Sequence, residues 1–308
     1  MGLLCHGTTT DMNLVALDWG TTSLRGALLA ADARVLEERT FPRGILTVDQ
    51  GGFAQVFESC FGDWMQSSTL CLIAGMAGSQ QGWLEAPYCP CPAGFFDIAA
   101  RLAWVTSNKP GKIAIVPGLS IDKDGVPDVM RGEETQVFGA IELLGLKDTR
   151  MVLPGTHSKW VTVSAGRLTD FSTWMTGEFY ALLRQHSILA RTLPSNDTTH
   201  NEAAFEQGVA CALQGDGLLH TAFSVRTLSL FKCMATEALP SYLSGLVIGE
   251  ELKSQQLKRG DSVVLVGAES LTTKYEQALN QLGVRSQCVG NLATWHGLRK
   301  IADTLNTP

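Results

Sequence analysis

The sequence lacks any long apolar run and any basic cluster. No apolar stretch approaches the roughly 20 residues that a membrane-spanning helix needs. The 24 lysines and arginines are outnumbered by 30 aspartates and glutamates, which gives a formal net charge of −6 over 308 residues. This balance does not favour nucleic acid or an anionic membrane as a partner, so we expect neither.

The sequence also lacks the patterns of zinc-binding and secreted proteins. Only Cys89 and Cys91 lie close together among eight cysteines, and no second pair stands at a zinc-like spacing. Residues 1–13 have neither the basic start nor the apolar core of a signal peptide. We therefore expect reduced thiols, a loose N-terminal extension and a cytoplasmic location.

A further absence argues against a nicotinamide-dependent dehydrogenase. No G-x-G-x-x-G run follows the first predicted strand with an acidic residue about 20 positions later. The sequence has no low-complexity segment and no short-period repeat. What remains, with 45% hydrophobic and 18% charged residues, is a globular α/β chain long enough for two domains.

The stretch Leu17–Leu29 predicts a β-hairpin with a polar tip. Apolar runs flank the tip, and Asp18 stands just before it. Glycine lets the backbone approach a phosphate, which hydroxyls and N–H groups can then bind, and the Asp18 carboxylate would face Mg²⁺. An ordinary hairpin with an aspartate near its turn is the alternative. The tip consists of Gly20, Thr21, Thr22 and Ser23.

A second copy of this pattern stands at residues 153–163, half a chain later. Apolar residues again flank the tip, although Leu153 replaces the aspartate. Two such hairpins suggest a duplicated domain in which each half contributes one tip to a nucleotide's phosphates. The second tip consists of Gly155, Thr156, His157 and Ser158.

Hydrophobic periodicity predicts the other elements. Helices are expected at Gly51–Met65, 130–146, Asn201–Leu213, Leu239–Leu257 and Asn291–Leu305, with two more that begin near Thr176 and after Ser270. Strands are expected at Arg34–Phe41, Leu70–Ile73, Lys112–Val116, Arg167–Thr169, Asp261–Val266 and Ser286–Val289, and a turn at Asp122–Gly125.

Two segments outside the hairpins are candidates for chemistry. The strand Leu70–Ile73 runs into a glycine-rich loop and then an aromatic, polar loop up to Tyr88, which either holds a small polar substrate or packs locally through Trp83. Glu133 and Glu134 begin the helix after residue 130. They serve either as a general base or only as acids favoured by the helix dipole.

Together these pieces resemble the acetate-kinase, sugar-kinase, heat-shock-protein-70 and actin superfamily. DWGTTSLRG and LPGTHSKWV resemble its two phosphate motifs, and VVLVGAESLTTKY its adenosine motif. Within this superfamily, the sequence is similar to the 2-dehydro-3-deoxygalactonokinase family. The matching runs are LDWGTTSLRGALL, AGMAGSQQGWLEAPYCPCPAG, VMRGEETQVFGAI, LPGTHSKWV, STWMTGEFYALLRQHSIL and YLSGLVIGEEL.

The resemblance implies two ribonuclease-H-like domains, at residues 1–142 and 143–308, with ATP in a cleft between them and the last helix packing back on the first domain. It implies that ATP and Mg²⁺ phosphorylate the terminal hydroxyl of 2-dehydro-3-deoxy-D-galactonate, a step of galactonate breakdown. The alternatives are a kinase for another sugar or sugar acid, and a non-catalytic ATP-binding switch. Whether the protein forms a homodimer is left open.

The resemblance also implies residue roles. Asp18 acts on Mg²⁺, and Glu133 or Glu134 is the base. The phosphates meet Gly20, Thr21, Thr22, Ser23 and Arg25 from one hairpin and Gly155, Thr156 and His157 from the other. The adenosine is bordered by Gly267, Ala268, Ser270 and Leu271, and the sugar acid by Ser79, Gln80, Trp83, Arg131 and Lys159.

Overall fold

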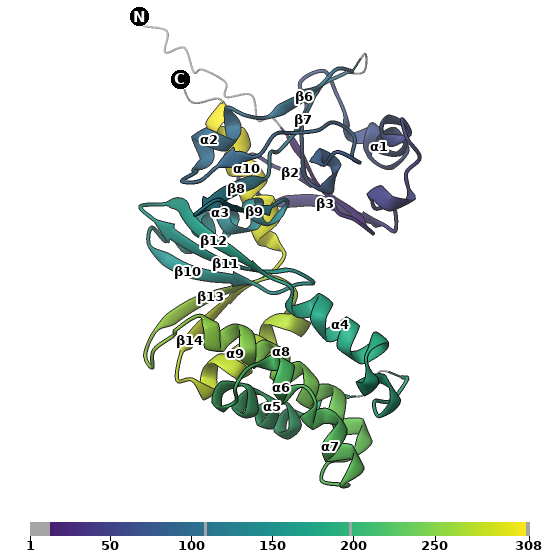
Figure 1. Ribbon diagram of the computed structural model, residues 1–308. Helices are drawn as coiled ribbons and strands as arrows, with labels where there is room; N and C mark the ends of the chain where they lie inside the picture. The colour runs from purple at the N-terminus through teal and green to yellow at the C-terminus, as the bar shows by residue number, and fades with distance from the viewer. Residues whose placement is uncertain (1–12, 108–109, 197–198, 306–308) are drawn as a thin grey trace, which may run out of the picture. The chain divides into compact units, whose positions relative to one another are not determined.

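The computed structural model describes residues 13–107, 110–196 and 199–305, so all but Asn13 of the expected N-terminal extension lies outside it. The chain divides into two compact units (Figure 1). Unit 1 comprises Met1–Lys147, Ala165–Thr169 and Asn291–Pro308, and unit 2 comprises Asp148–Ser164 and Asp170–Gly290. Each unit is described by itself.

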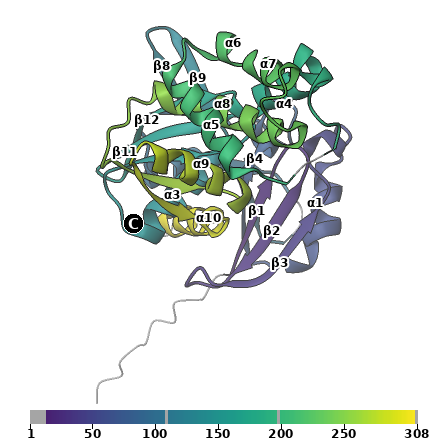
Figure 2. The same ribbon diagram turned by 90° about the horizontal axis from the view of Figure 1, so that it is seen from below.

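Unit 1 is built on a six-stranded sheet in the order β3-β2-β1-β4-β7-β6. The first three strands form an antiparallel meander, side by side in Figure 2, while β4 and β7 run parallel to β1. The bounds are β1 Leu14–Trp19, β2 Leu24–Leu29, β3 Val35–Phe41, β4 Leu70–Gly75, β6 Ala103–Val105 and β7 Lys112–Ile115.

Helices pack on this sheet because its central strands β1 and β4 are apolar and buried on both faces. Phe57 and Phe61 of α1 join Val15 and Leu17 of β1 in one buried cluster. The last helix, α10, packs on β1, β4 and α3, so the end of the chain completes unit 1 (Figure 1). The bounds are α1 Phe53–Phe61, α2 Phe95–Ala99, α3 Glu133–Leu144 and α10 Leu292–Leu305.

Two glycines let α3 and α10 cross at backbone contact. A Cβ atom on Gly139 would lie 1.7 Å from the carbonyl oxygen of Ala293, and one on Gly297 would lie 1.9 Å from that of Thr135. No side chain fits at either position unless the helices separate.

A small sheet in the order β5-β8-β9 was not predicted. The expected turn at residues 122–125 is confirmed: Asp124 and Gly125, both with positive φ, join β8 to β9. Asp-Gly favours such tight hairpins. The bounds are β5 Cys89–Pro90, β8 Leu119–Lys123 and β9 Val126–Met130.

Unit 2 repeats the strand order of unit 1. Its sheet runs β12-β11-β10-β13-β14, which matches β3-β2-β1-β4-β7. The predicted duplication into two ribonuclease-H-like α/β units is therefore confirmed. The bounds are β10 Thr149–Leu153, β11 Ser158–Ser164, β12 Arg167–Trp174, β13 Ser262–Val266 and β14 Arg285–Val289.

The helices of unit 2 form two buried clusters. Phe205, Ile248 and Tyr275 pack beside the sheet residue Val152, and α5 and α8 cross closely in a second cluster around Leu243. Within the described residues, no helix is both long and apolar enough to cross a membrane. The bounds are α4 Thr176–His186, α5 Glu202–Gln214, α6 Leu218–Thr221, α7 Ser224–Leu230, α8 Leu239–Ser254 and α9 Glu269–Gln281.

Candidate active site

Asp18 lies near the end of β1 and is held by an ion pair. Alternation along the strand turns it away from the α1 cluster that contains Leu17 and Trp19. Its Oδ2 accepts a hydrogen bond from Nη2 of Arg25, 2.6 Å away and opposite in β2. The Arg25 guanidinium also lies 5.9 Å from the ring centroid of Trp295 in α10. Arg25, predicted to meet the nucleotide, is thus the partner of Asp18 in this structure.

The ends of β1 and β4 meet the start of α3. Gly75, the last residue of β4, has a φ of 89°, and a Cβ atom there would lie 3.1 Å from Oδ1 of Asp18. Gly132, just before α3, has a φ of 105°, and a Cβ there would lie 3.2 Å from the Cα of Gly75. These glycines allow a close approach that brings the Asp18 carboxylate and the first turn of α3 to one corner of unit 1.

Two carboxyl groups occupy that first turn and differ in environment. Glu133 is partly exposed and accepts a hydrogen bond from the backbone N–H of Arg131 at 3.0 Å. Glu134 is fully buried, and its Oε2 accepts from the N–H of Gly132 at 2.6 Å. Its Oε1 is buried and has no hydrogen-bond partner among the described residues. Burial, with the neighbouring charge of Glu133, raises the pKa of Glu134 to about 8.

Arg131 lies against the loop that follows β4. Its Nη2 donates to the carbonyl oxygen of Ala86 at 2.8 Å, and its guanidinium lies 4.4 Å from the ring centroid of Tyr88. A Cβ on Gly78 would be 2.6 Å from Nη1. Nε and Nη1 are buried without a hydrogen-bond partner within the described parts of the chain. Such a guanidinium is suited to a carboxylate ligand.

The other predicted substrate residues of this loop separate into two groups. Ser79 is half-buried and donates its hydroxyl to the carbonyl oxygen of Met76 at 2.8 Å, and Gln80 is exposed. Trp83 is partly buried and packs against the core, with its ring centroid 6.1 Å from that of Trp19 and 5.6 Å from that of Phe57. For Trp83 the structure therefore favours the local-packing alternative.

The first hairpin tip is rigidly supported. The N–H of Gly20 donates to the carbonyl oxygen of Ser23 at 2.9 Å and closes the turn. The N–H of Ile45 donates to the carbonyl oxygen of Gly20 at 3.0 Å, and a Cβ on Gly44 would be 2.2 Å from the backbone of Thr21. Thr21 is exposed. The tip is thus a fixed, accessible polar turn.

In unit 2 the second tip rests on the start of α4. A Cβ on Gly177 would lie 2.5 Å from the carbonyl oxygen of Gly155, and the N–H of Glu178 donates to the carbonyl oxygen of Thr156 at 3.0 Å. The His157 ring lies 2.6 Å from the Glu178 carboxylate. The predicted candidate Lys159 is 4% exposed in β11, and its Nζ donates to the carbonyl oxygen of His157 at 3.2 Å.

Beside this tip lies a pocket that contains one of the predicted adenosine residues. The pocket, of 130 Å³, includes Gly155 of the tip and Leu271 of α9. A neighbouring pocket of 250 Å³ shares Tyr180, Ser244 and Lys274 with it. Gly267 and Ala268 form the turn into α9, Ser270 lies in the first turn of that helix, and none of the three lines either pocket.

The three shared pocket residues were missed in the sequence. Tyr180, Ser244 and Lys274 come from three helices that are distant along the chain. Tyr180 and Ser244 lie within runs that carried the family resemblance and Lys274 within the superfamily's adenosine motif, but no spacing rule linked them. Burial lowers the pKa of the Lys274 ammonium.

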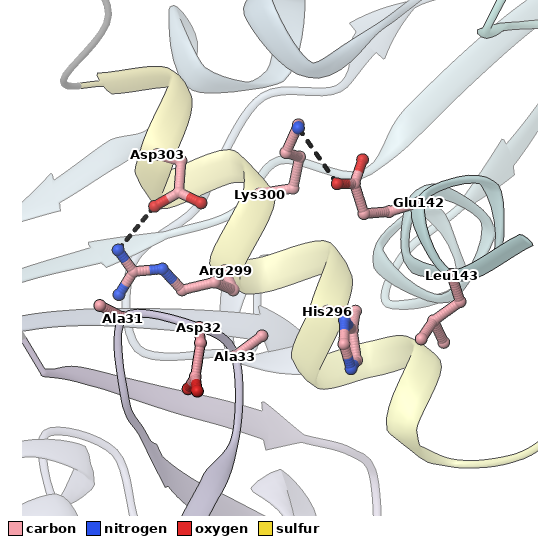
Figure 3. A pocket seen from close by; sticks show the side chains of 9 residues that line it. All are labelled: Ala31, Asp32, Ala33, Glu142, Leu143, His296, Arg299, Lys300 and Asp303. Atoms are coloured by element: carbon pink, nitrogen blue, oxygen red, sulfur yellow. Dashed lines mark hydrogen bonds and ion pairs between the residues drawn. The ribbon is translucent and has the colours of Figure 1, made fainter. Parts of the chain in front are cut away.

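A separate charged pocket of 440 Å³ lies in unit 1 between the β2–β3 turn, α3 and α10 (Figure 3). Four of its five Asp, Glu, Lys and Arg side chains are paired with each other, because Lys300 pairs with Glu142 at 3.2 Å and Arg299 with Asp303 at 2.6 Å. None of the predicted site residues lines it, so we do not assign it to the reaction.

Asp18 is also the one predicted metal-facing residue. Among the described residues, no three His, Cys, Asp or Glu side chains are grouped as a metal site would need. Mg²⁺ commonly keeps several waters and binds through one or two carboxylates and the phosphates of its substrate. A single carboxylate, Asp18, beside the predicted phosphate-binding turn fits that mode.

Comparison with known proteins gives a consistent result. The family model described as 2-keto-3-deoxy-galactonokinase matches residues 18–301. The 2-dehydro-3-deoxygalactonokinase of Escherichia coli K12 is 36% identical over 291 residues, which cover 94% of this chain and 97% of the relative. A solved structure from Sinorhizobium meliloti that carries the same enzyme name is 34% identical, covers 95% of this chain and 98% of its own, and has a TM-score of 0.86.

A more distant structure shares the fold alone. Component A of the (R)-2-hydroxyglutaryl-CoA dehydratase of Acidaminococcus fermentans is 12% identical, with a TM-score of 0.50 and coverage of 96% of this chain and 99% of its own. The family match spans the first hairpin, the loop after β4, the start of α3 and the second hairpin. This chain therefore belongs to the 2-keto-3-deoxy-galactonokinase family.

Proposed function

We propose that this protein is a kinase that uses ATP and Mg²⁺ to phosphorylate the terminal hydroxyl of 2-dehydro-3-deoxy-D-galactonate, giving the 6-phosphate. Family membership over nearly the whole chain supports the reaction class. The observation that carries the mechanism is the meeting of Asp18, Gly75 and the Glu133–Glu134 turn in one corner of unit 1.

In this proposal the protein mainly positions groups and balances charge, because phosphoryl transfer needs little covalent help. The tips at Gly20–Ser23 and Gly155–His157 would bind phosphate oxygens, and Asp18 would hold Mg²⁺. The metal, when bound, neutralises charge on the transferring phosphoryl group. The carboxylate of Glu134 accepts the proton of the attacking hydroxyl. We favour Glu134 over Glu133 because its raised pKa suits proton transfer near neutral pH.

The substrate and nucleotide would bind through groups that are already fixed. Arg131 would bind the sugar-acid carboxylate through the guanidinium nitrogens that lack a partner among the described residues. The linked pockets beside Leu271, Tyr180 and Lys274 would receive the adenosine. Lys159 remains a second candidate for an anionic group.

The function is tested by an ADP-release assay with Mg-ATP across a panel of 2-keto-3-deoxy sugar acids. We expect the highest kcat/KM with 2-dehydro-3-deoxygalactonate, and no measurable turnover in Asp18→Ala, since Mg²⁺ positioning would be lost. Preference for another sugar acid would contradict the substrate. Binding of ATP with no sugar-stimulated ADP release would contradict the kinase and favour a switch.

Arg131→Met tests the carboxylate contact. Hydrogen bonds to charged groups contribute about 1.5–3 kcal/mol, so we expect KM for the sugar acid to rise by about 10- to 150-fold with KM for ATP little changed. The control is Arg34→Met, because Arg34 is two-thirds exposed in the turn just before the outer strand β3. A rise confined to KM for ATP would contradict the assignment.

A further inference from the structure

Glu251 is a buried carboxyl group in unit 2 that three different elements contact. It lies in α8 and is 1% exposed. Its Oε1 accepts from Nε1 of Trp160 in β11 at 2.6 Å, and its Oε2 accepts from the hydroxyl of Tyr275 in α9 at 2.7 Å and from that of Thr176 at the start of α4. All three partners are donors.

Two of these partners adjoin the pocket beside the second hairpin tip. Thr176 and Tyr275 themselves line that pocket, and Tyr275 stands next to Lys274 on α9. Thr176 precedes Gly177, whose backbone touches Gly155.

The hairpin strand is tied to the same network twice. Trp160 donates directly to Glu251, and the hydroxyl of Ser158 lies 2.9 Å from that of Tyr275. Ser158 immediately follows the tip residue His157. One side chain of α8 therefore fixes the tip strand, the α4 start and α9 together.

Burying a carboxyl group costs free energy, because the group loses its contacts with water. Burial raises the pKa of Glu251, while the bonds from Thr176, Tyr275 and Trp160 lower it. Well-packed apolar side chains of similar volume often stabilise a fold as well as a buried charged network does. What the network adds is orientation, because hydrogen bonds fix direction as well as distance.

We propose that Glu251 is a positioning residue for ATP: through Trp160, Thr176 and Tyr275 it sets the geometry of the pocket that receives the nucleotide. This inference rests on the proposed function only in that the pocket binds ATP. It does not depend on which sugar acid is phosphorylated. Glu251 itself contacts no reacting atom in this proposal.

The test is Glu251→Leu beside Glu251→Gln. Leucine removes the acceptor for all three donors, and we expect the Kd for ATP, measured by calorimetry without sugar acid, to rise by about tenfold or more. Glutamine keeps one acceptor oxygen, and the two hydroxyls can turn to accept from its amide. We therefore expect Glu251→Gln to restore Kd to within about threefold of the wild-type value.

A merely structural role predicts a different pattern, in which the melting temperature falls while Kd for ATP stays unchanged. That result would overturn the proposal. If Glu251→Leu does not fold, Trp160→Phe and Tyr275→Phe each remove one donor, and unchanged Kd in both would overturn it equally. The control is Glu276→Gln on the same helix as Tyr275, since Glu276 lies outside both pockets.

The readouts separate this inference from the proposed reaction. If folded wild-type protein binds ATP but turns over no sugar acid, the proposed kinase activity is contradicted. The proposed role of Glu251 in ATP binding is not affected by that result. A raised Kd for ATP in Glu251→Leu together with an unchanged KM for the sugar acid would support both the role of Glu251 and the proposed reaction.

Discussion

Replacing Glu134 by glutamine is expected to lower kcat for sugar-acid phosphorylation by about 10²- to 10⁴-fold, the range that general bases contribute. Glutamine has nearly the same shape but cannot accept the hydroxyl proton. The fold should survive, because a carboxyl group whose pKa is raised to about 8 is largely neutral at pH 7, as an amide is. Steady-state kinetics with a circular-dichroism check of folding measure the effect.

Glu133→Gln is the matched comparison, one residue away in the same helical turn. We expect a loss of less than about tenfold, because Glu133 is partly exposed and its carboxylate already accepts a hydrogen bond from the backbone N–H of Arg131. A larger loss of kcat in Glu133→Gln than in Glu134→Gln would identify Glu133 as the general base instead. Full activity in both variants would leave only the helix-dipole explanation for this pair.

The pH profile gives an independent readout of the same residue. A base must be deprotonated, so kcat/KM should rise with pH through about 8 and then level off. Stability should move in the opposite direction. The folded state retains a proton that the unfolded chain releases near the ordinary value of 4.5, so the contribution of Glu134 to the free energy of unfolding is complete below that pH and is lost as pH rises toward about 8.

The second large effect concerns the crossing of α3 and α10. In an exposed helix Gly→Ala would stabilise by about 1 kcal/mol. In Gly139→Ala and Gly297→Ala the new Cβ would lie 1.7 and 1.9 Å from backbone oxygens, which cannot move without the helices. We therefore expect each variant to lose about 3 kcal/mol or more of unfolding free energy, at or above the upper end of ordinary overpacking.

Urea denaturation of the folded protein measures this loss. Gly290→Ala is the control, because a Cβ there meets no atom within 4 Å. Wild-type stability in both Gly139→Ala and Gly297→Ala would show that the helices separate at little cost. Activity should fall together with stability, since α3 also carries Glu134.

The hairpins, most helices and the duplicated plan could be predicted because each follows from local pattern. The strands β8 and β9 could not, since Pro127 and Asp128 in β9 and the polar end of β8 resemble loop sequence and only pairing makes them extended. In α4 the apolar residues Phe179 and Leu182 follow helical spacing yet are 42% and 43% exposed. Periodicity identifies a helix but does not show what covers it.

The site was predicted where one segment supplies the chemistry and missed where packing does. Asp18 and the Glu133–Glu134 turn are recognisable in the sequence, but their approach depends on positive φ at Gly75 and Gly132, which no alternation of residues reveals. The ion pair of Arg25 with Asp18 follows from strand register. Tyr180, Ser244 and Lys274 converge only through the packing of three helices.

That α10 belongs to unit 1 has a consequence for biosynthesis. Residues 14–144 leave the ribosome early, but the helix that supports β1, β4 and α3 is made only after the strands and helices of unit 2. While translation continues, the first half of the chain lacks α10, and unit 2 can fold before unit 1 is complete. A nascent chain stalled before residue 292 would therefore lack the support for the turn that bears Glu134.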